Sequence, residues 1–205
     1  RMALRGLVWP FQWLGLKGDA NLPPLTRALH ALGPAYIKFG QVLSTRPDVV
    51  GAELAMQLRV LQDKLPPFPV DVAKAEVEKE LGVSIDSVFS EFSDPVAAAS
   101  IAQVHKARLV SDGEFVAVKA LRPRIERAFQ KDIDAFYLAA WVFDRFSPSS
   151  RRLRPLDVIE HFEGVVLSEL DLRLESASAS EFADNTAQDK GFTLPRVRWG
   201  LSARR

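Results

Sequence analysis

The chain has 205 residues, of which 47% are hydrophobic and 26% charged, and its formal net charge is +1. This length suffices to bury a hydrophobic core, while a charge so close to zero gives no concentrated basic surface of the kind that binds nucleic acid. The chain has no cysteine, which excludes disulfides and thiolate metal sites, and its three histidines show no metal-ligand spacing. We expect no metal ligands in this chain and no nucleic-acid partner.

The first element along the chain is an aromatic, weakly basic segment, Leu4–Leu14. It fits either a membrane interface or packing of its tryptophans onto the helices that follow. No run reaches the roughly 18 apolar residues that a membrane span needs.

Residues 24–64 are predicted to be helical because their leucines recur at helical intervals. Breaks are expected at Gly33-Pro34 and at Arg46-Pro47-Asp48. The proline-rich stretch Leu65–Pro69 reads as a stiff linker. We therefore predict two regions: a helical extension over residues 1–65 and a second domain over 66–205, which opens with a helix at 70–82 ended by Gly82.

A loop of small side chains and two strands follow. The strand Gln103–Leu109, a hairpin signal at Ser111–Gly113 and the strand Phe115–Lys119 are expected in that order. Small side chains let a backbone approach a ligand closely, and a strand-end lysine can neutralise phosphate oxygens. Together they predict a nucleotide clamp of the kinase type, although Lys119 alone would read as an ordinary surface lysine. The candidate nucleotide-binding residues are Val96, Ala97, Ala98, Ala99, Ser100, Ile101, Ala102, Gln103, Val104 and Lys119.

The remaining elements are one or two helices over 122–146, one long helix over about 156–187, and a closing strand at 192–199. On a continuous helix Asp171 and Glu175 share a face, so that one or both can address the sheet, whereas Glu169 lies about 160° away. The alternative is that these carboxylates are exposed to solvent and have no specific partner, as is common for acidic residues on a helix. In the extension, Lys38 and Gln41 share a helical face, and Gly40 between them would allow another backbone to approach closely.

These segments together resemble one family. Lys38-Phe39-Gly40-Gln41 is similar to a K-x-G-Q motif, Ala97–His105 to an alanine-rich loop, Val116–Lys119 to a nucleotide-lysine strand, and Glu169-Leu170-Asp171 to an E-x-D motif. Their order and content are those of UbiB, the atypical kinase-like proteins of ubiquinone biosynthesis, and the resemblance runs from about residue 25 to 199.

The resemblance implies an α+β fold: the N-terminal lobe of a protein-kinase-like domain, with a small antiparallel sheet and a long helix equivalent to αC, preceded by the helical extension. It implies that Lys119 binds ATP phosphates and pairs with Glu175, and that the alanine loop covers the nucleotide. It also implies that Lys38 and Gln41 lie over the active site near Glu169 and Asp171. The catalytic candidates are Lys119, Glu175, Lys38, Gln41, Glu169 and Asp171.

The chain departs from a complete kinase-like domain because it contains no catalytic-loop H-x-D…N and no D-F-G. The ligands of Mg²⁺ are expected in a C-terminal lobe that these 205 residues do not include, so this segment alone is not expected to turn over ATP. The whole protein is expected to be an atypical kinase or ATPase with ATP or ADP, quinone-lipid precursors and ubiquinone-biosynthesis enzymes as partners, at the cytoplasmic face of a bacterial inner membrane. The alternative is a non-enzymatic helical scaffold of a biosynthetic complex.

Overall fold

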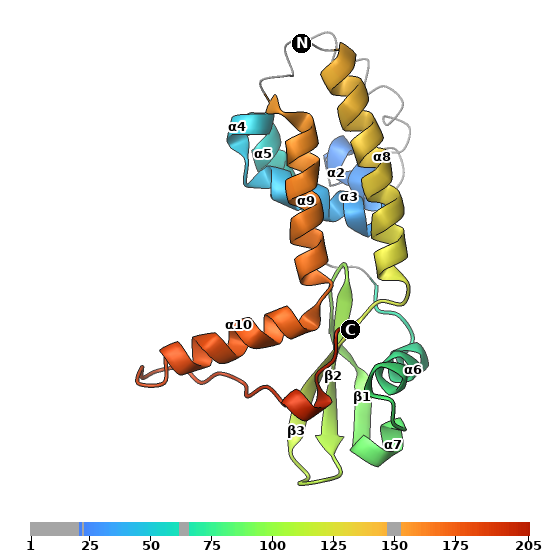
Figure 1. The fold of residues 1–205 in the computed structure, drawn as a ribbon, viewed down its shortest axis with the longest axis vertical. Coiled ribbons are helices and arrows are strands. Elements are labelled where there is room, and N and C mark those ends of the chain that lie inside the picture. The colour runs from blue at the N-terminus through green and yellow to red at the C-terminus, as the bar shows by residue number, and fades with distance from the viewer. Residues whose placement is uncertain (1–20, 22, 62–65, 147–152) are drawn as a thin grey trace. The chain divides into compact units, whose positions relative to one another are not determined.

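The computed structural model describes residues 21, 23–61, 66–146 and 153–205. These form two compact units (Figure 1). The first unit combines residues 1–65 with 126–162, and the second combines residues 66–125 with 163–205. The aromatic segment Leu4–Leu14 lies outside the described residues.

The first unit is helical. Among its described residues up to position 61, there are four short helices: α2 (Pro24–Leu32), α3 (Pro34–Ser44), α4 (Pro47–Val50) and α5 (Ala52–Leu58). A proline stands in the first turn of α2, α3 and α4, where its missing N–H costs no hydrogen bond. The expected breaks at Gly33-Pro34 and Arg46-Pro47 are confirmed.

Two longer helices complete the first unit. They are α8 (Ile125–Phe146), a single helix of 22 residues, and α9 (Pro155–Glu169), which continues into the second unit. Their contact with α3 is aromatic. The ring of Phe39 stacks on Phe136 at 4.8 Å between centroids and meets Phe162 edge-on at 5.1 Å, while Phe136 and Phe162 lie 5.8 Å apart. This cluster holds α3, α8 and α9 together.

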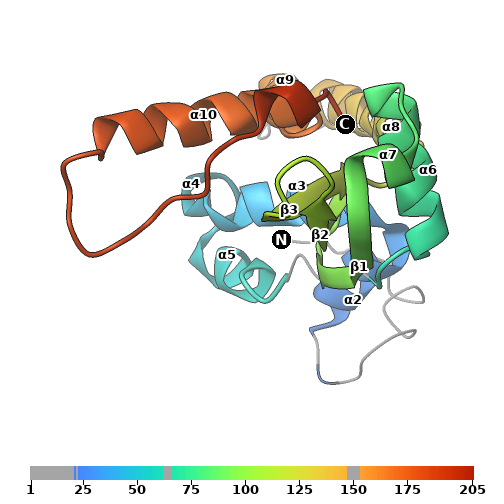
Figure 2. The same ribbon diagram turned by 90° about the horizontal axis from the view of Figure 1, so that it is seen from below.

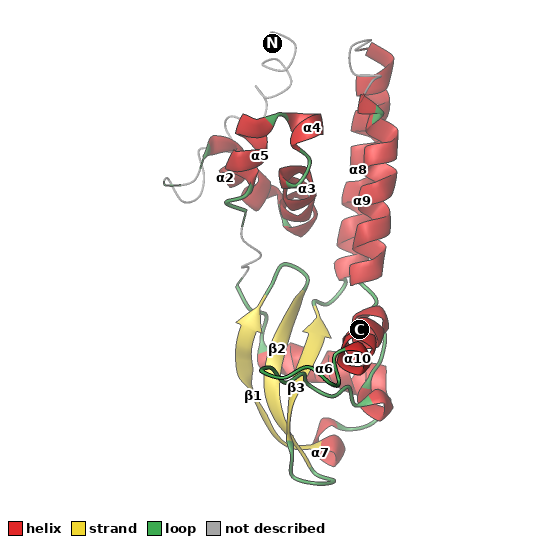
Figure 3. Ribbon diagram, turned by 90° about the vertical axis from the view of Figure 1, so that its left-hand side faces the viewer, coloured by secondary structure: helices red, strands yellow, loops and turns green. Residues whose placement is uncertain are grey.

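The second unit is built on a three-stranded antiparallel sheet in the order β1-β2-β3 (Figure 3). Its strands are β1 (Phe89–Ala98), β2 (Ala102–Leu109) and β3 (Phe115–Leu121). The last two are joined by the expected hairpin, in which Gly113 takes a φ of 70°. This α+β organisation confirms the expected fold class.

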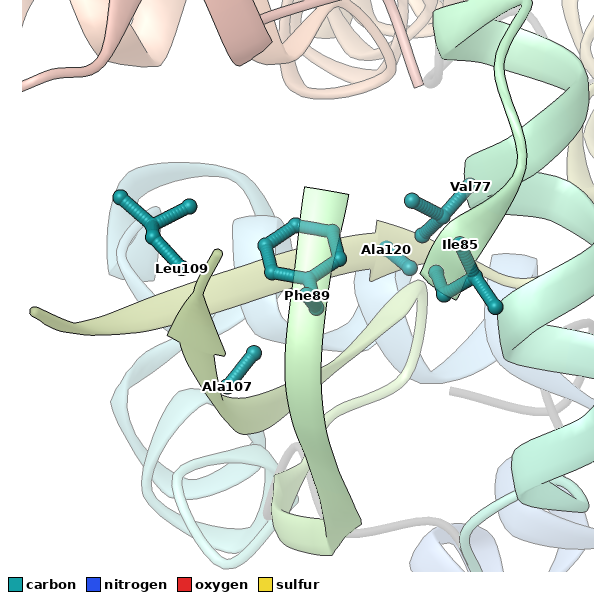
Figure 4. Close-up of a cluster of buried hydrophobic side chains, with 6 residues drawn as sticks. All are labelled: Val77, Ile85, Phe89, Ala107, Leu109 and Ala120. Carbon is teal, nitrogen blue, oxygen red and sulfur yellow. The ribbon is translucent and has the colours of Figure 1, made fainter. Parts of the chain in front are cut away.

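Helices α6 (Val70–Leu81) and α7 (Ile85–Val88) lie beside β1 in Figures 1 and 2. Gly82 ends α6 in the left-handed conformation, with φ of 70°, as the sequence predicts. The core between these helices and one face of the sheet is shown in Figure 4 and consists of Val77, Ile85, Phe89, Ala107, Leu109 and Ala120.

Two expected elements are wrong. The long helix predicted over 156–187 is interrupted at Leu170-Asp171 and forms two helices, α9 and α10 (Leu172–Asn185). Asp171 has an extended backbone and its side chain accepts a hydrogen bond from the Arg173 backbone N–H, so it caps a new helix. The closing strand predicted at 192–199 is irregular chain followed by the short 3₁₀-helix η3 (Trp199–Leu201), because no neighbouring strand pairs with it.

Candidate functional site: a lysine–glutamate pair on the small sheet

An ion pair joins the sheet to α10. The Nζ atom of Lys119, near the end of β3, lies 2.7 Å from Oε1 and 2.5 Å from Oε2 of Glu175. The side chain of Lys119 is 36% exposed and that of Glu175 59% exposed. The pair is therefore reachable by a ligand, and the ion pair expected from the sequence is confirmed.

The register of the sheet places small side chains beside Lys119. Val104 of β2 is opposite Lys119 of β3 and opposite Ala97 of β1, so the three form one cross-strand row on the same face. Ala117 lies two residues before Lys119 and points to that same face. This face is opposite to the one that carries Ala107 and Ala120 of the core. A cation thus stands at the edge of a small apolar platform.

The turn between β1 and β2 is shorter than the alanine-rich loop expected from the sequence. Ala97 and Ala98 belong to β1, and Ala102 begins β2, which leaves only Ala99, Ser100 and Ile101 between the strands. The Ala99 N–H donates to the Ala102 carbonyl at 2.8 Å. Much of the alanine-rich segment is therefore held by strand pairing between β1 and β2.

Arg122, which directly follows β3, stabilises the β1–β2 turn through hydrogen bonds. Its Nη2 atom donates to the carbonyl of Ala99 at 3.0 Å and to that of Pro66 at 2.8 Å. Its backbone N–H donates to the Ile101 carbonyl at 2.8 Å. Partial burial lowers the pKa of Arg122, yet a guanidinium stays charged at any physiological pH. A turn held in this way is a fixed wall of the site rather than a mobile glycine-rich flap.

Gln103 has a structural role that the sequence analysis missed. Its Oε1 accepts from the Phe68 N–H at 2.9 Å, and its Nε2 lies 3.2 Å from the Phe68 carbonyl and 2.9 Å from Nε2 of His105. Because the amide NH₂ end faces His105, the imidazole accepts there and donates from Nδ1 to the Ser93 carbonyl at 2.8 Å. Gln103 and His105 are both buried, so they join the linker to the sheet instead of facing a ligand.

The other candidate nucleotide-binding residues divide by exposure. Ser100 and Ala102 are buried like Gln103, whereas Val96 and Ala97 are exposed, and Ala98, Ala99, Ile101 and Val104 are half-buried. Backbone groups of the turn and the side chains of Ala97 and Val104 are the parts of this segment that a ligand can reach.

Asp171 is held by its neighbour Arg173. The guanidinium donates to both carboxylate oxygens at 2.9 and 2.6 Å. This hydrogen bonding lowers the pKa of Asp171 to about 2, so the carboxylate is ionised at physiological pH. Asp171 is the N-cap of the helix that carries Glu175, and the ion pair with Lys119 depends on where this helix begins.

Comparison with known proteins shows which family the chain is similar to. Residues 60–205 match the ABC1 atypical kinase-like domain. The chain is 41% identical over 205 residues to the probable protein kinase UbiB of Pseudomonas paraeruginosa, 41% over 176 residues to that of Marinobacter nauticus, and 39% over 199 residues to that of Aeromonas hydrophila. The alignments cover 97, 85 and 96% of this chain and 38, 32 and 36% of those relatives.

The chain belongs to the UbiB family of ABC1 atypical kinase-like proteins. The resemblance carried by the four motifs is thereby confirmed, and the sheet with its Lys119–Glu175 pair belongs to the kinase-like domain. The chain spans only about a third of the length of the relatives it matches.

The K-x-G-Q motif of this UbiB-family chain lies in α3 and organises the helical unit. Its variable residue is Phe39, whose ring belongs to the aromatic cluster described above. The Nε2 atom of Gln41 donates to the Leu61 carbonyl at 3.4 Å. Lys38 and Gln41 belong to the first unit and Glu169 and Asp171 to the second, so their expected proximity stays a prediction.

Gly40 is buried against leucine side chains. A Cβ atom built on it would lie 2.3 Å from Cδ1 of Leu61 and 3.0 Å from Cδ1 of Leu29. Gly164, in the middle of α9, has no atom within 4 Å of the same position. Two mid-helix glycines thus have opposite surroundings.

We predict that Gly40→Ala destabilises the protein by about 1 kcal/mol, because overpacking costs about 1–3 kcal/mol and alanine returns about 1 kcal/mol of helix propensity. Gly164→Ala meets no neighbour and should stabilise by up to about 1 kcal/mol. Urea denaturation of both variants measures whether each change lowers or raises the free energy of unfolding. Equal stabilisation by both would contradict the packing role of Gly40.

Neither a membrane-spanning helix nor a metal site is found in the part of the chain that the structure describes. None of the described helices combines the length and the apolarity that crossing a membrane requires. Among the described residues no three His, Asp or Glu side chains are grouped as metal ligands.

Proposed function

We propose that this protein binds ATP on the open face of its three-stranded sheet, with Lys119 at the phosphates. The observation that carries the proposal is the Lys119–Glu175 pair beside the apolar row of Ala97 and Val104. A compact ammonium group suits phosphate oxygens, and small apolar side chains can pack against the face of a nucleobase. Glu175 orients the lysine before the nucleotide arrives.

The described residues do not fit Mg²⁺, since no group of three potential acidic or histidine ligands is present among them and Glu175 is engaged by Lys119. We derive no step through the metal. In the proposal this chain supplies the orienting lysine, the wall of the β1–β2 turn and the apolar platform, and the ligands of the metal come from a C-terminal lobe.

The family supports a role in ubiquinone biosynthesis, as the names of its UbiB relatives imply. We propose that ATP binding or hydrolysis in the whole protein makes quinone-lipid precursors accessible to biosynthetic enzymes at the cytoplasmic face of the inner membrane. The alternative is a helical scaffold for such enzymes that needs no nucleotide.

Nucleotide binding separates the two functions. We expect ATP and ADP to raise the melting temperature of the protein at its full natural length, because saturation to 100 times Kd adds about 2.7 kcal/mol to the free energy of unfolding. In parallel, the gene is introduced into a bacterial strain that lacks UbiB, and its ubiquinone content is measured. Restored ubiquinone without any nucleotide-dependent shift would favour the scaffold, and no restoration would overturn the biosynthetic role.

A further inference from the structure

Helix α10, which carries Glu175, is held to its unit by its first turn. Of its fourteen residues, all of which the structure describes, only Leu172 is buried. The Leu172 N–H donates to the Arg204 carbonyl at 2.9 Å, and Glu175 pairs with Lys119. The first N–H groups of a helix have no partner within the helix, so a carbonyl from another segment fixes where the helix starts. The position of Glu175 therefore depends on where Arg204 is held.

Arg205, the next residue, is held on two sides. Its Nη1 atom lies 3.1 Å from Oε2 of Glu76 in α6, and its Nη2 atom donates to the Arg122 carbonyl at 3.2 Å. The side chains of Arg205 and Glu76 are 14% and 20% exposed. Solvent and salt therefore screen this attraction less than that of the more exposed Lys119–Glu175 pair. The Glu76–Arg205 ion pair joins this segment of the chain to α6.

Arg122 connects Arg205 to one wall of the proposed site. Its guanidinium and its backbone N–H donate to carbonyls of the β1–β2 turn, and its own carbonyl accepts from Arg205. Residues 204–205 thus reach both sides of the site: the turn through Arg122, and the start of α10 through Leu172. In Figures 1 and 3 this end of the chain lies beside the start of α10.

We propose that Arg205 and Glu76 are positioning residues for the nucleotide. Their ion pair fixes residues 204–205, and these set the distance between α10 and the β1–β2 turn. At that distance Glu175 orients Lys119 beside the turn, while neither positioning residue touches the nucleotide. The inference rests on the proposed nucleotide site, and it adds α6, a helix outside that site, to the elements that control it.

The first measurement is isothermal titration of the protein at its full natural length with ATP. Glu76→Gln and Arg205→Gln are each expected to weaken ATP binding by about 5- to 10-fold. Because both residues act through one ion pair, the double variant should bind ATP no more weakly than the weaker of the single variants. The matched control is Glu80→Gln, which removes the same charge from α6, leaves the pair intact and should bind ATP like the wild type.

The second measurement separates a positioning role from a contribution to stability alone. Spin labels are attached to cysteines introduced at Ser90 of β1 and Ser178 of α10, which are both exposed, and their distance is measured by electron–electron double resonance. These 205 residues contain no cysteine, so only cysteines outside them have to be replaced by serine. We expect a narrow distance distribution in the wild type and a broader one in Glu76→Gln, which ATP narrows again.

Circular dichroism checks the folding of every variant. If Glu76→Gln or Arg205→Gln does not fold, both measurements are made on Arg205→Lys. This variant keeps the charge but lacks the planar fork that contacts Glu76 and Arg122 together, so we expect ATP binding weakened by about two- to threefold and a broader distance distribution.

Two results would overturn the inference and leave the nucleotide site standing. The first is wild-type ATP affinity in the variants that break the pair. The second is weaker ATP binding with an unchanged distance distribution, which would make the pair a structural contact only. A wild-type protein that binds no ATP would instead refute the proposed function, and the distance measurement without nucleotide would still show whether the Glu76–Arg205 pair sets the position of α10.

Discussion

Replacing Lys119 by methionine is expected to weaken ATP binding by about 10- to 100-fold, since hydrogen bonds to charged groups contribute about 1.5–3 kcal/mol. Methionine keeps an unbranched apolar stem that reaches about as far as Cε of lysine, and it lacks the ammonium group that lies 2.5–2.7 Å from the Glu175 oxygens. The measurement is isothermal titration of the protein at its full natural length with ATP and with ADP.

The fold should survive this change. Both partners are more than a third exposed, and ion pairs at such positions contribute about 0–1 kcal/mol to stability. The free energy of unfolding of Lys119→Met is therefore expected within about 1 kcal/mol of the wild type. An effect on affinity without one on stability would separate a binding residue from a structural one.

The matched control is Lys106→Met. Lys106 lies on the same face of the sheet, in β2, where its ammonium is 4.1 Å from the centroid of the Phe115 ring. It is not in the row of Lys119, so we expect unchanged ATP affinity. The ATP affinity of Glu175→Gln should lie between those of Lys119→Met and Lys106→Met, because Lys119 keeps its charge and loses its orienting partner. Wild-type affinity in Lys119→Met would refute the site.

The Lys119–Glu175 ion pair was predictable from the sequence, although the start of α10, the helix that carries Glu175, was not. Apolar residues recur at 167, 170 and 174, so the helical pattern runs unbroken through the position where α9 ends. The signal for the break is Asp171 itself, because aspartate is among the preferred N-cap residues. Glu175 still reaches Lys119, since a residue one turn inside a new helix can address the same sheet.

The groups that fix the site were not predictable from periodicity. Arg122 and Gln103 act through hydrogen bonds from side chains to backbone carbonyls and amides of Ala99, Pro66 and Phe68. Such bonds depend on which loops the fold brings together, and they cannot be predicted from residue type or spacing. The strand expected at 192–199 fails for a related reason: alternation of side chains makes a strand only where another strand is available to pair.

In the K-x-G-Q segment, two residues have a packing role in the structure and the other two have a role that is a prediction. Phe39 and Gly40 are fixed by the aromatic cluster and by leucine side chains, which a helical pattern partly predicts. The proposed role of Lys38 and Gln41 over the nucleotide requires the two units to meet. It is tested by joining Lys38 to Glu169 or Asp171 with a chemical cross-linker, for which success within the monomer is the expected result.

The largest loss of stability is expected from Phe162→Ala. Phe162 is fully buried in α9 and its ring touches Phe39 of α3 and Phe136 of α8. Truncation removes the shared contact of three helices and leaves a cavity, a change that costs about 3–5 kcal/mol. That loss is a large part of the 5–15 kcal/mol by which domains are typically stable, so much of the helical unit should unfold near physiological temperature.

The control for this loss is Phe182→Ala in α10, where the ring stacks on Phe192 at 6.3 Å but is 53% exposed. Its cost should stay below about 1 kcal/mol, as for surface positions generally. Chemical denaturation monitored by circular dichroism compares the two variants with the wild type. Similar small losses in both would mean that α3, α8 and α9 are held together by contacts other than the aromatic cluster, and that the motif helix is positioned without Phe39.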